Sequence, residues 1–339
     1  MSDHRRREPA PGVFRLVLPL PFPGLDRCNA YLLAGDEGCI LVDCGIWDPN
    51  ASDGSFSELD AAVTATGHSV ADIATLVVTH PHTDHYGMAG KVVEVTGCEL
   101  WMHAAARAEL EMYLDPEVLA GELRAMLEKH GVGSDEIDEL AAFEDWRPFV
   151  HSMVEASRWV GDGDTIEVGG RTWTFVHTPG HDGASICLWS ATDRILISGD
   201  TLLGSITPHI DFRRGDENPL GDFLASLKKI EQLDPALVLP GHGRPFEDGA
   251  DRARVTAQHH DRRLGAIVQV VRREPHTANE ITDEIFSRTL LNFERRLALG
   301  EALAHLAYLR RSGEIERFEG SDGRFLYVKA SRPPRDDEE

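Results

Sequence analysis

An apolar run that ends directly in a cluster of histidines and an aspartate is the most constraining feature of this sequence. Residues 73–78 are apolar and β-branched, which predicts a buried strand, and His-Pro-His-Thr-Asp-His at 80–85 follows at once. Three later apolar runs lead, through a glycine, to His181, Asp200 and His242. Binding sites in α/β sheets form where strands end. The sequence therefore predicts one site assembled from the ends of several strands.

The side chains in these positions suit metal binding. Neutral imidazole and carboxylate are ligands that divalent first-row metals accept at neutral pH. His80 and His82 are two residues apart on an extended turn, so they can point at the same ion. Asp84 and His85 begin the next segment and can serve a second ion. The pattern predicts a dinuclear metal site.

Together with Asp43-x-Gly45, these residues resemble the metallo-β-lactamase superfamily over about residues 13–251. The resemblance implies an α/β fold of the four-layer αββα sandwich type. It also implies the ligands: His80, His82 and His181 for the first ion, Asp84, His85 and His242 for the second, and Asp200 bridging the two. Asp43 is expected to orient ligands from behind, a role that metal sites generally need.

The implied activity is hydrolysis. Two ions can share a bridging hydroxide that attacks the carbonyl of an ester, thioester or lactone. Asp84 and Asp200 are the expected catalytic residues, with Asp84 stabilising or protonating the leaving group. His209 and Tyr86 are candidates for contacting the substrate. Two Zn²⁺ ions are favoured, and iron or manganese stays open for the same ligand set.

The chain is expected to hold two folded parts. The sandwich is predicted over 13–252, with a helical insertion at about 104–158 that either packs on the sheet or forms a lid over the site. Three helices and a hairpin over 253–330 predict a winged-helix-like domain, in which His259-His260 is expected to be solvated or to lie between the domains. Thr277-Ala278-Asn279-Glu280 is a capping box that predicts the start of its second helix. The polar ends, 1–12 and 331–339, are expected to be disordered.

A formal net charge of −23 over 339 residues disfavours nucleic acid as the main partner. The winged-helix branch of the superfamily includes thioesterases and an endoribonuclease, so RNA cleavage is the alternative to acyl hydrolysis. An iron-dependent oxidoreductase of the same fold is a further alternative. The expected partner is a small-molecule or acyl-type substrate.

The remaining composition indicates an intracellular protein. The N-terminus lacks the apolar segment of a signal peptide, and no apolar run is long enough to span a membrane. Five cysteines at irregular spacing indicate buried, reduced thiols rather than a disulfide framework. We therefore expect a cytoplasmic protein, with a homodimer as a possible assembly through the C-terminal domain.

Overall fold

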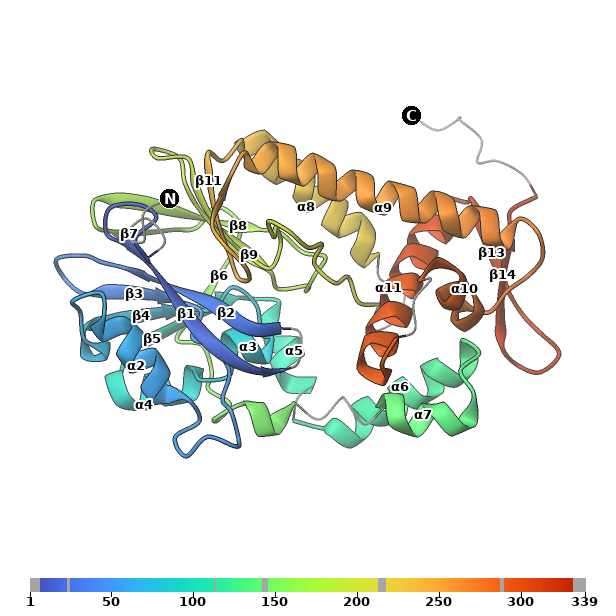
Figure 1. The fold of residues 1–339 in the computed structure, drawn as a ribbon, viewed down its shortest axis with the longest axis horizontal. Coiled ribbons are helices and arrows are strands. Elements are labelled where there is room, and N and C mark those ends of the chain that lie inside the picture. The colour runs from blue at the N-terminus through green and yellow to red at the C-terminus, as the bar shows by residue number, and fades with distance from the viewer. Residues whose placement is uncertain are drawn as a thin grey trace. The chain divides into compact units, whose positions relative to one another are not determined.

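The structure is a computed structural model that describes residues 7–22, 25–112, 114–141, 146–212, 218–286 and 290–331 (Figure 1). The chain forms two compact units. The first takes its described residues from Met1–Tyr113, Trp146–Pro208 and Ser226–Arg254, and the second from Leu114–Asp145, His209–Ala225 and Val255–Glu339. Most of the ends predicted to be disordered, 1–6 and 332–339, lie outside the described residues.

Six strands form the first sheet of the first unit, in the order in which they follow along the chain. They are β1 (Val13–Phe22), β2 (Leu25–Leu33), β3 (Cys39–Val42), β4 (Ile73–Val77), β5 (Glu99–His103) and β6 (Arg158–Val160). The pairs β1–β2 and β2–β3 are antiparallel, and the pairs from β3 to β6 are parallel. The parallel strands end at one edge, so residues that follow them can meet there.

The second sheet has the order β12-β11-β10-β9-β8-β7. Its strands are β7 (Thr165–Val168), β8 (Arg171–His177), β9 (Ile186–Ser190), β10 (Ile195–Gly199), β11 (Leu237–Pro240) and β12 (Phe246–Glu247). The inner faces of the two sheets share one apolar core, which contains Tyr31 and Val77 from the first sheet and Phe175, Leu188 and Ile197 from the second. Burial of these large side chains holds the two sheets together.

Helices cover the outer face of the first sheet in Figure 1. Helices α2 (Phe56–Thr64) and α4 (Ala89–Thr96) bury Leu59 and Val92 in the core that lies behind β3, β4 and β5. On the second sheet, Ser226 of α8 (Pro219–Leu233) donates from Oγ to the Pro179 carbonyl at 2.8 Å. These layers confirm the predicted αββα sandwich. A short helix α5 (Ala106–Met112) follows β5.

The chain from Thr83 to Thr96 forms two short helices, α3 (Thr83–Tyr86) and α4, because it leaves helical geometry at Met88. Ser55 stands at the N-cap of α2, but its side chain makes no capping hydrogen bond. Asp53 takes that role instead, because its carboxylate accepts from the backbone N–H groups of Ser55 and Ser57.

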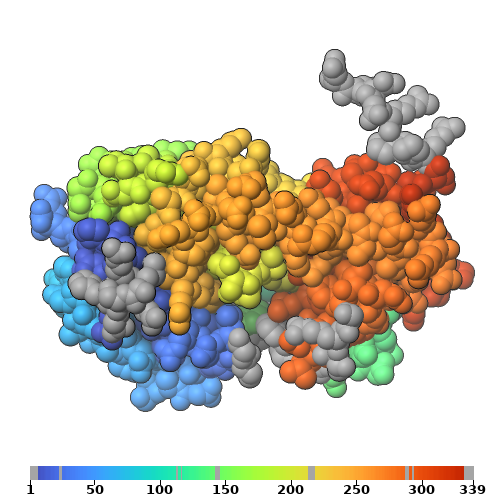
Figure 2. Space-filling view, turned by 45° about the horizontal axis from the view of Figure 1, so that its top comes forward, coloured from blue at the N-terminus to red at the C-terminus, as the bar shows by residue number. Residues whose placement is uncertain are grey.

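The C-terminal part of the chain forms three helices followed by a hairpin, in the predicted order, and all of it from Val255 onwards belongs to the second unit. These are α9 (Gly249–Val271), α10 (Ala278–Ile285), α11 (Asn292–Arg311), β13 (Ile315–Glu319) and β14 (Phe325–Lys329). The predicted capping box opens α10, where Thr277 accepts from the backbone of Glu280 and the Glu280 carboxylate accepts from Thr277. Helix α9 (orange) lies at the surface along much of its length in Figure 2.

The helical insertion predicted at about 104–158 does not belong to a single unit. Helices α6 (Pro116–Lys129) and α7 (Ser134–Ala141) cluster with the C-terminal helices, in the second unit, rather than with the sheets. His130, after α6, explains why: its carbonyl accepts from the Asn279 N–H at 3.0 Å, and its ring lies 3.2 Å from the Tyr327 hydroxyl. Both partners are far away in the sequence.

Within the described residues, no helix is long and apolar enough to cross a membrane.

Candidate metal centre

The predicted ligands lie together in the first unit, each shortly after the end of a strand. His80 follows β4, His181 follows β8, Asp200 directly follows β10 and His242 follows β11. Side chains from both sheets therefore meet at one edge of the sandwich. They form overlapping groups whose ligand atoms lie within 4.8 Å of one another: His80–His82–His181, His80–His85–Asp200 and Asp84–His85–His242.

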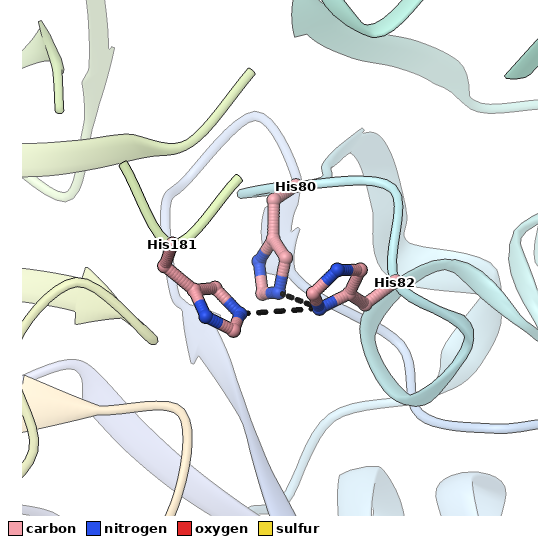
Figure 3. Close-up of side chains that lie close together, drawn as sticks. All are labelled: His80, His82 and His181. Carbon is pink, nitrogen blue, oxygen red and sulfur yellow. Dashed lines mark hydrogen bonds between the residues drawn. The ribbon is translucent and has the colours of Figure 1, made fainter. Parts of the chain in front are cut away.

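Three histidine rings form the first group (Figure 3). Nδ1 of His82 lies 3.1 Å from Nε2 of His80 and 3.1 Å from Nε2 of His181. The three nitrogens converge on one point (Figure 3), with His80 and His82 following β4 and His181 following β8. Such spacing fits three ligands of one ion, because nitrogens bound to zinc at about 2.0–2.1 Å are roughly 3.3 Å apart in tetrahedral geometry.

Two carboxylates and two imidazoles form the second group. Nε2 of His242 lies 3.1 Å from Asp84 Oδ2 and 3.2 Å from Asp200 Oδ2. Nε2 of His85 lies 3.5 Å from Asp200 Oδ1. Asp200 also approaches the first group, with Oδ2 at 3.9 Å from His181 Nε2. Its carboxylate thus lies between the two groups, where a bridging ligand would be.

Unsatisfied atoms at this place fit a divalent cation. Nε2 of His85 and Oδ1 of Asp200 are buried, and neither has a hydrogen-bond partner among the described residues. Buried polar atoms are rarely left in that state. The donors are imidazole nitrogens and carboxylate oxygens, which are ligands that zinc, iron or manganese accepts. The residues present therefore fit divalent metal ions.

The buried carboxylates of the site carry negative charge that nearby positive charge stabilises. Burial opposes ionisation of Asp84, but His85 and His242 outweigh it and lower the pKa of that carboxyl. The same two rings lower the pKa of Asp200. In return, Asp200 and Asp84 overcome the burial of His242 and raise its pKa to about 11. Anionic carboxylates in a buried place thus attract positive charge, which metal ions would supply.

Residues behind the ligands fix their orientation. Asp43 accepts from Nδ1 of His85 at 2.8 Å, from the Thr79 N–H at 2.7 Å and from the Thr79 hydroxyl at 2.9 Å. Nδ1 of His242 donates to the Arg27 carbonyl at 3.0 Å. These bonds leave the Nε2 lone pairs facing the site. Sequence reasoning missed Thr79, although its place directly before His80 could have suggested it.

Sequence reasoning also missed two carboxylates beside His82. Glu109 of α5 and Asp182 form a group with this ring, and Nε2 of His82 lies 3.9 Å from Asp182 Oδ2. Asp182 thus approaches Nε2 of His82, whereas Nδ1 of the same ring faces the other two histidines. The position of Asp182 directly after His181 was the available signal. The sequence of α5 gave no signal that would have pointed to Glu109.

The two residues predicted to contact substrate, Tyr86 and His209, lie in different surroundings. Tyr86 is fully buried, and its hydroxyl donates to the Val154 carbonyl at 3.1 Å and accepts from the Val154 N–H at 2.8 Å. These bonds commit the tyrosine to joining two chain segments, which argues against the predicted substrate contact. His209 belongs to the second unit, where its ring lies 3.8 Å from both Asp211 and Glu301.

Comparison with known proteins agrees with this geometry. Residues 23–242 match the family described as metallo-beta-lactamase superfamily, and residues 264–330 match the metallo-beta-lactamase-like C-terminal domain. A beta-lactamase domain protein from Burkholderia ambifaria has a similar crystal structure, with 32% identity, a TM-score of 0.81, and coverage of 95% of this chain and 93% of that one.

Two relatives carry names that describe an activity. The probable metallo-hydrolase YqjP of Bacillus subtilis is 26% identical over 334 residues, which is 94% of this chain and 98% of that protein. The acyl-coenzyme A thioesterase MBLAC2 of Homo sapiens is 27% identical over 243 residues, 67% of this chain and 76% of that protein. Since the family match covers well over half of the sequence and coincides with the ligand groups, the chain belongs to the metallo-beta-lactamase superfamily.

Proposed function

We propose that the chain is a hydrolase that cleaves ester, thioester or lactone bonds with the help of two divalent cations, zinc before iron or manganese. The observation that carries this proposal is the convergence of two ligand groups with Asp200 between them. The first cation would be held by His80, His82 and His181, the second by Asp84, His85 and His242, and both by Asp200.

The cations would supply Lewis acidity, which activates water and polarises the acyl carbonyl. The chain's own residues position the reaction. Among the three site carboxylates, Asp84 has the most exposed side chain, at 16% against 10% for Asp200 and 3% for Asp43. As an anionic carboxylate, Asp84 can accept the proton that the attacking water releases and pass it to the departing oxygen or sulfur. Cysteine nucleophiles do not fit, because all five thiols are buried and burial raises the pKa of Cys187 to about 11.

Thioesters are the best supported substrate class. The relative MBLAC2 is named as an acyl-coenzyme A thioesterase, and its similarity covers two thirds of this chain. The net charge of −23 does not favour RNA, which is held through its phosphates by basic residues. Coenzyme A also carries phosphates, so the same charge favours a thioester with a smaller or less charged leaving group.

The test is hydrolysis by the purified chain of four substrates: an acyl-coenzyme A, the same acyl group on N-acetylcysteamine, an acyl lactone and a phosphodiester. Metal content is measured on the same samples. We expect turnover of a thioester with about two metal ions per chain, and loss of both turnover and at least one ion in Asp200→Ala. His68→Asn, which changes a histidine outside the ligand groups, serves as the control.

Three outcomes would contradict the proposal. Phosphodiester cleavage without acyl hydrolysis would favour the endoribonuclease alternative. Iron at one ion per chain with no hydrolysis would favour an oxidoreductase. Full turnover and an unchanged metal content in a folded Asp200→Ala protein would remove Asp200 from the site.

A further inference from the structure

A second cluster of potential metal ligands lies in the second unit, on helices α9 and α11. His260, Glu301 and His305 each place one ligand atom within 4.8 Å of the others. Both histidines are fully buried, and the Glu301 side chain is 12% exposed. We propose that these three residues bind a further divalent first-row metal ion, with Zn²⁺ as the best fit to two imidazoles and a carboxylate.

Hydrogen bonding fixes the first ligand. Glu301 and His305 are four residues apart on α11, so they lie on the same face of the helix. Nδ1 of His305 donates to the Glu301 carbonyl at 2.7 Å. Nε2 of His305 therefore carries a lone pair. Donation of the other ring N–H to a carbonyl is the usual arrangement for a histidine that binds a metal.

The second ligand lies at the right separation. Nδ1 of His260 is 3.1 Å from Nε2 of His305. The same ring-nitrogen separation, 3.1 Å, occurs between His82 and each of its two neighbours in the candidate metal centre. Burial lowers the pKa of both His260 and His305 to about 3. Both rings are therefore neutral at pH 7 and have no extra proton that a metal would need to displace.

A hydrogen bond alone explains this pair poorly. If Nδ1 of His260 donates to His305, Nε2 of His260 keeps a lone pair, and that buried atom has no hydrogen-bond partner among the described residues. The rings of Phe223 and His259 are nearly perpendicular to the His260 ring, at 81° and 89°. A ring face can accept an N–H weakly, but it offers nothing to a lone pair. Metal binding at Nδ1, which puts the proton on Nε2, suits these surroundings better.

Glu301 completes the set, and its neighbours limit the affinity. Arg263 forms an ion pair with Glu301 through Oε1, and His209 lies 3.8 Å from Oε2. The arginine holds the carboxylate in place but offsets part of its charge. The cluster also offers three ligands to its ion, whereas each ion proposed at the strand ends would have four. We therefore expect weaker metal binding here than at the strand ends.

Metal counting on matched variants tests the proposal. The wild-type chain, His305→Gln, His260→Asn and His259→Asn are stripped with a chelator, reloaded with Zn²⁺, desalted and analysed for zinc per chain. Circular dichroism verifies the fold of each. We expect both cluster variants to bind one ion fewer than wild type, and His259→Asn to bind as many. His259 is the matched control because it neighbours His260 on α9 but lies outside the cluster.

Two results would overturn the proposal: an unchanged zinc content in a folded cluster variant, or an equal loss in His259→Asn. The difference between variants does not depend on how many ions the strand-end site holds. If neither cluster variant folds, the number of zinc ions bound per wild-type chain decides. The strand-end site is expected to hold two ions, so three per chain supports the proposal and two or fewer rejects it.

Discussion

Gly241 shows how closely the backbone approaches the candidate metal centre. A Cβ atom at this position would lie 2.2 Å from Oδ1 of Asp200 and 2.7 Å from Cε1 of His85. Real Cβ atoms do not approach other atoms that closely, so any other residue would displace a ligand. The glycine before His242 is therefore required by the site itself.

We predict that Gly241→Ala lowers metal affinity by about tenfold to a hundredfold, which is the range found when residues that orient ligands are changed. The cause is displacement of the Asp200 carboxylate or the His85 ring, and the measurement is Zn²⁺ titration of stripped protein. Gly183→Ala is the matched control, because a Cβ there meets no atom within 4 Å. Equal affinities for the two variants would show that the site tolerates the displacement.

At the scale of elements, the sequence predicted what depends on local pattern. Apolar runs located the strands that lead to the ligands, and the spacing of Thr277 and Glu280 located the start of α10. The strand-end rule brought the ligands together before their distances were known. Local pattern could not predict where α6 and α7 pack, because their partners Asn279 and Tyr327 lie some 150 to 200 residues further along the chain. It also gave no sign that His260 would be buried.

His130, at the end of α6, makes the stability of the second unit depend on pH. Burial, with smaller contributions from Arg317 and Arg310, lowers its pKa to about 4 from an ordinary value of 6.5. Between these values the unfolded chain binds a proton that the folded chain does not. The unfolding free energy therefore falls as the pH decreases from about 6.5 towards 4, and this contribution is constant above that window.

We predict that His130→Gln weakens this pH dependence. The wild-type unfolding free energy should fall by about 2 kcal/mol more between pH 7 and pH 5 than that of the variant. Urea unfolding of both proteins at pH 5, 7 and 8 measures the difference. The interval from pH 7 to 8 is the internal control, because the two proteins should behave alike there. Parallel curves down to pH 5 would mean that His130 is protonated in the folded protein.

At the scale of the whole molecule, the candidate metal centre joins parts of the first unit that are distant in sequence. Its ligands come from four separate segments, which follow β4, β8, β10 and β11 and belong to both sheets. Three buried or partly buried carboxylates, Asp43, Asp84 and Asp200, gather there. Without cations, the carboxylates of Asp84 and Asp200 repel each other at close range. Bound metal should therefore hold the two sheets together as well as take part in chemistry.

We predict that Zn²⁺ stabilises the first unit against heat in proportion to the logarithm of its concentration. A ligand that binds only the folded state adds about 2.7 kcal/mol when its concentration is a hundred times the dissociation constant. The His305→Gln chain is the proper background, because it removes the proposed site in the second unit. Thermal unfolding of stripped protein is followed across a zinc series. In this background, zinc should raise the Tm of the Asp200→Ala variant far less than it raises the Tm of the parent. Equal shifts in both would mean that zinc stabilises the chain from somewhere other than the strand ends.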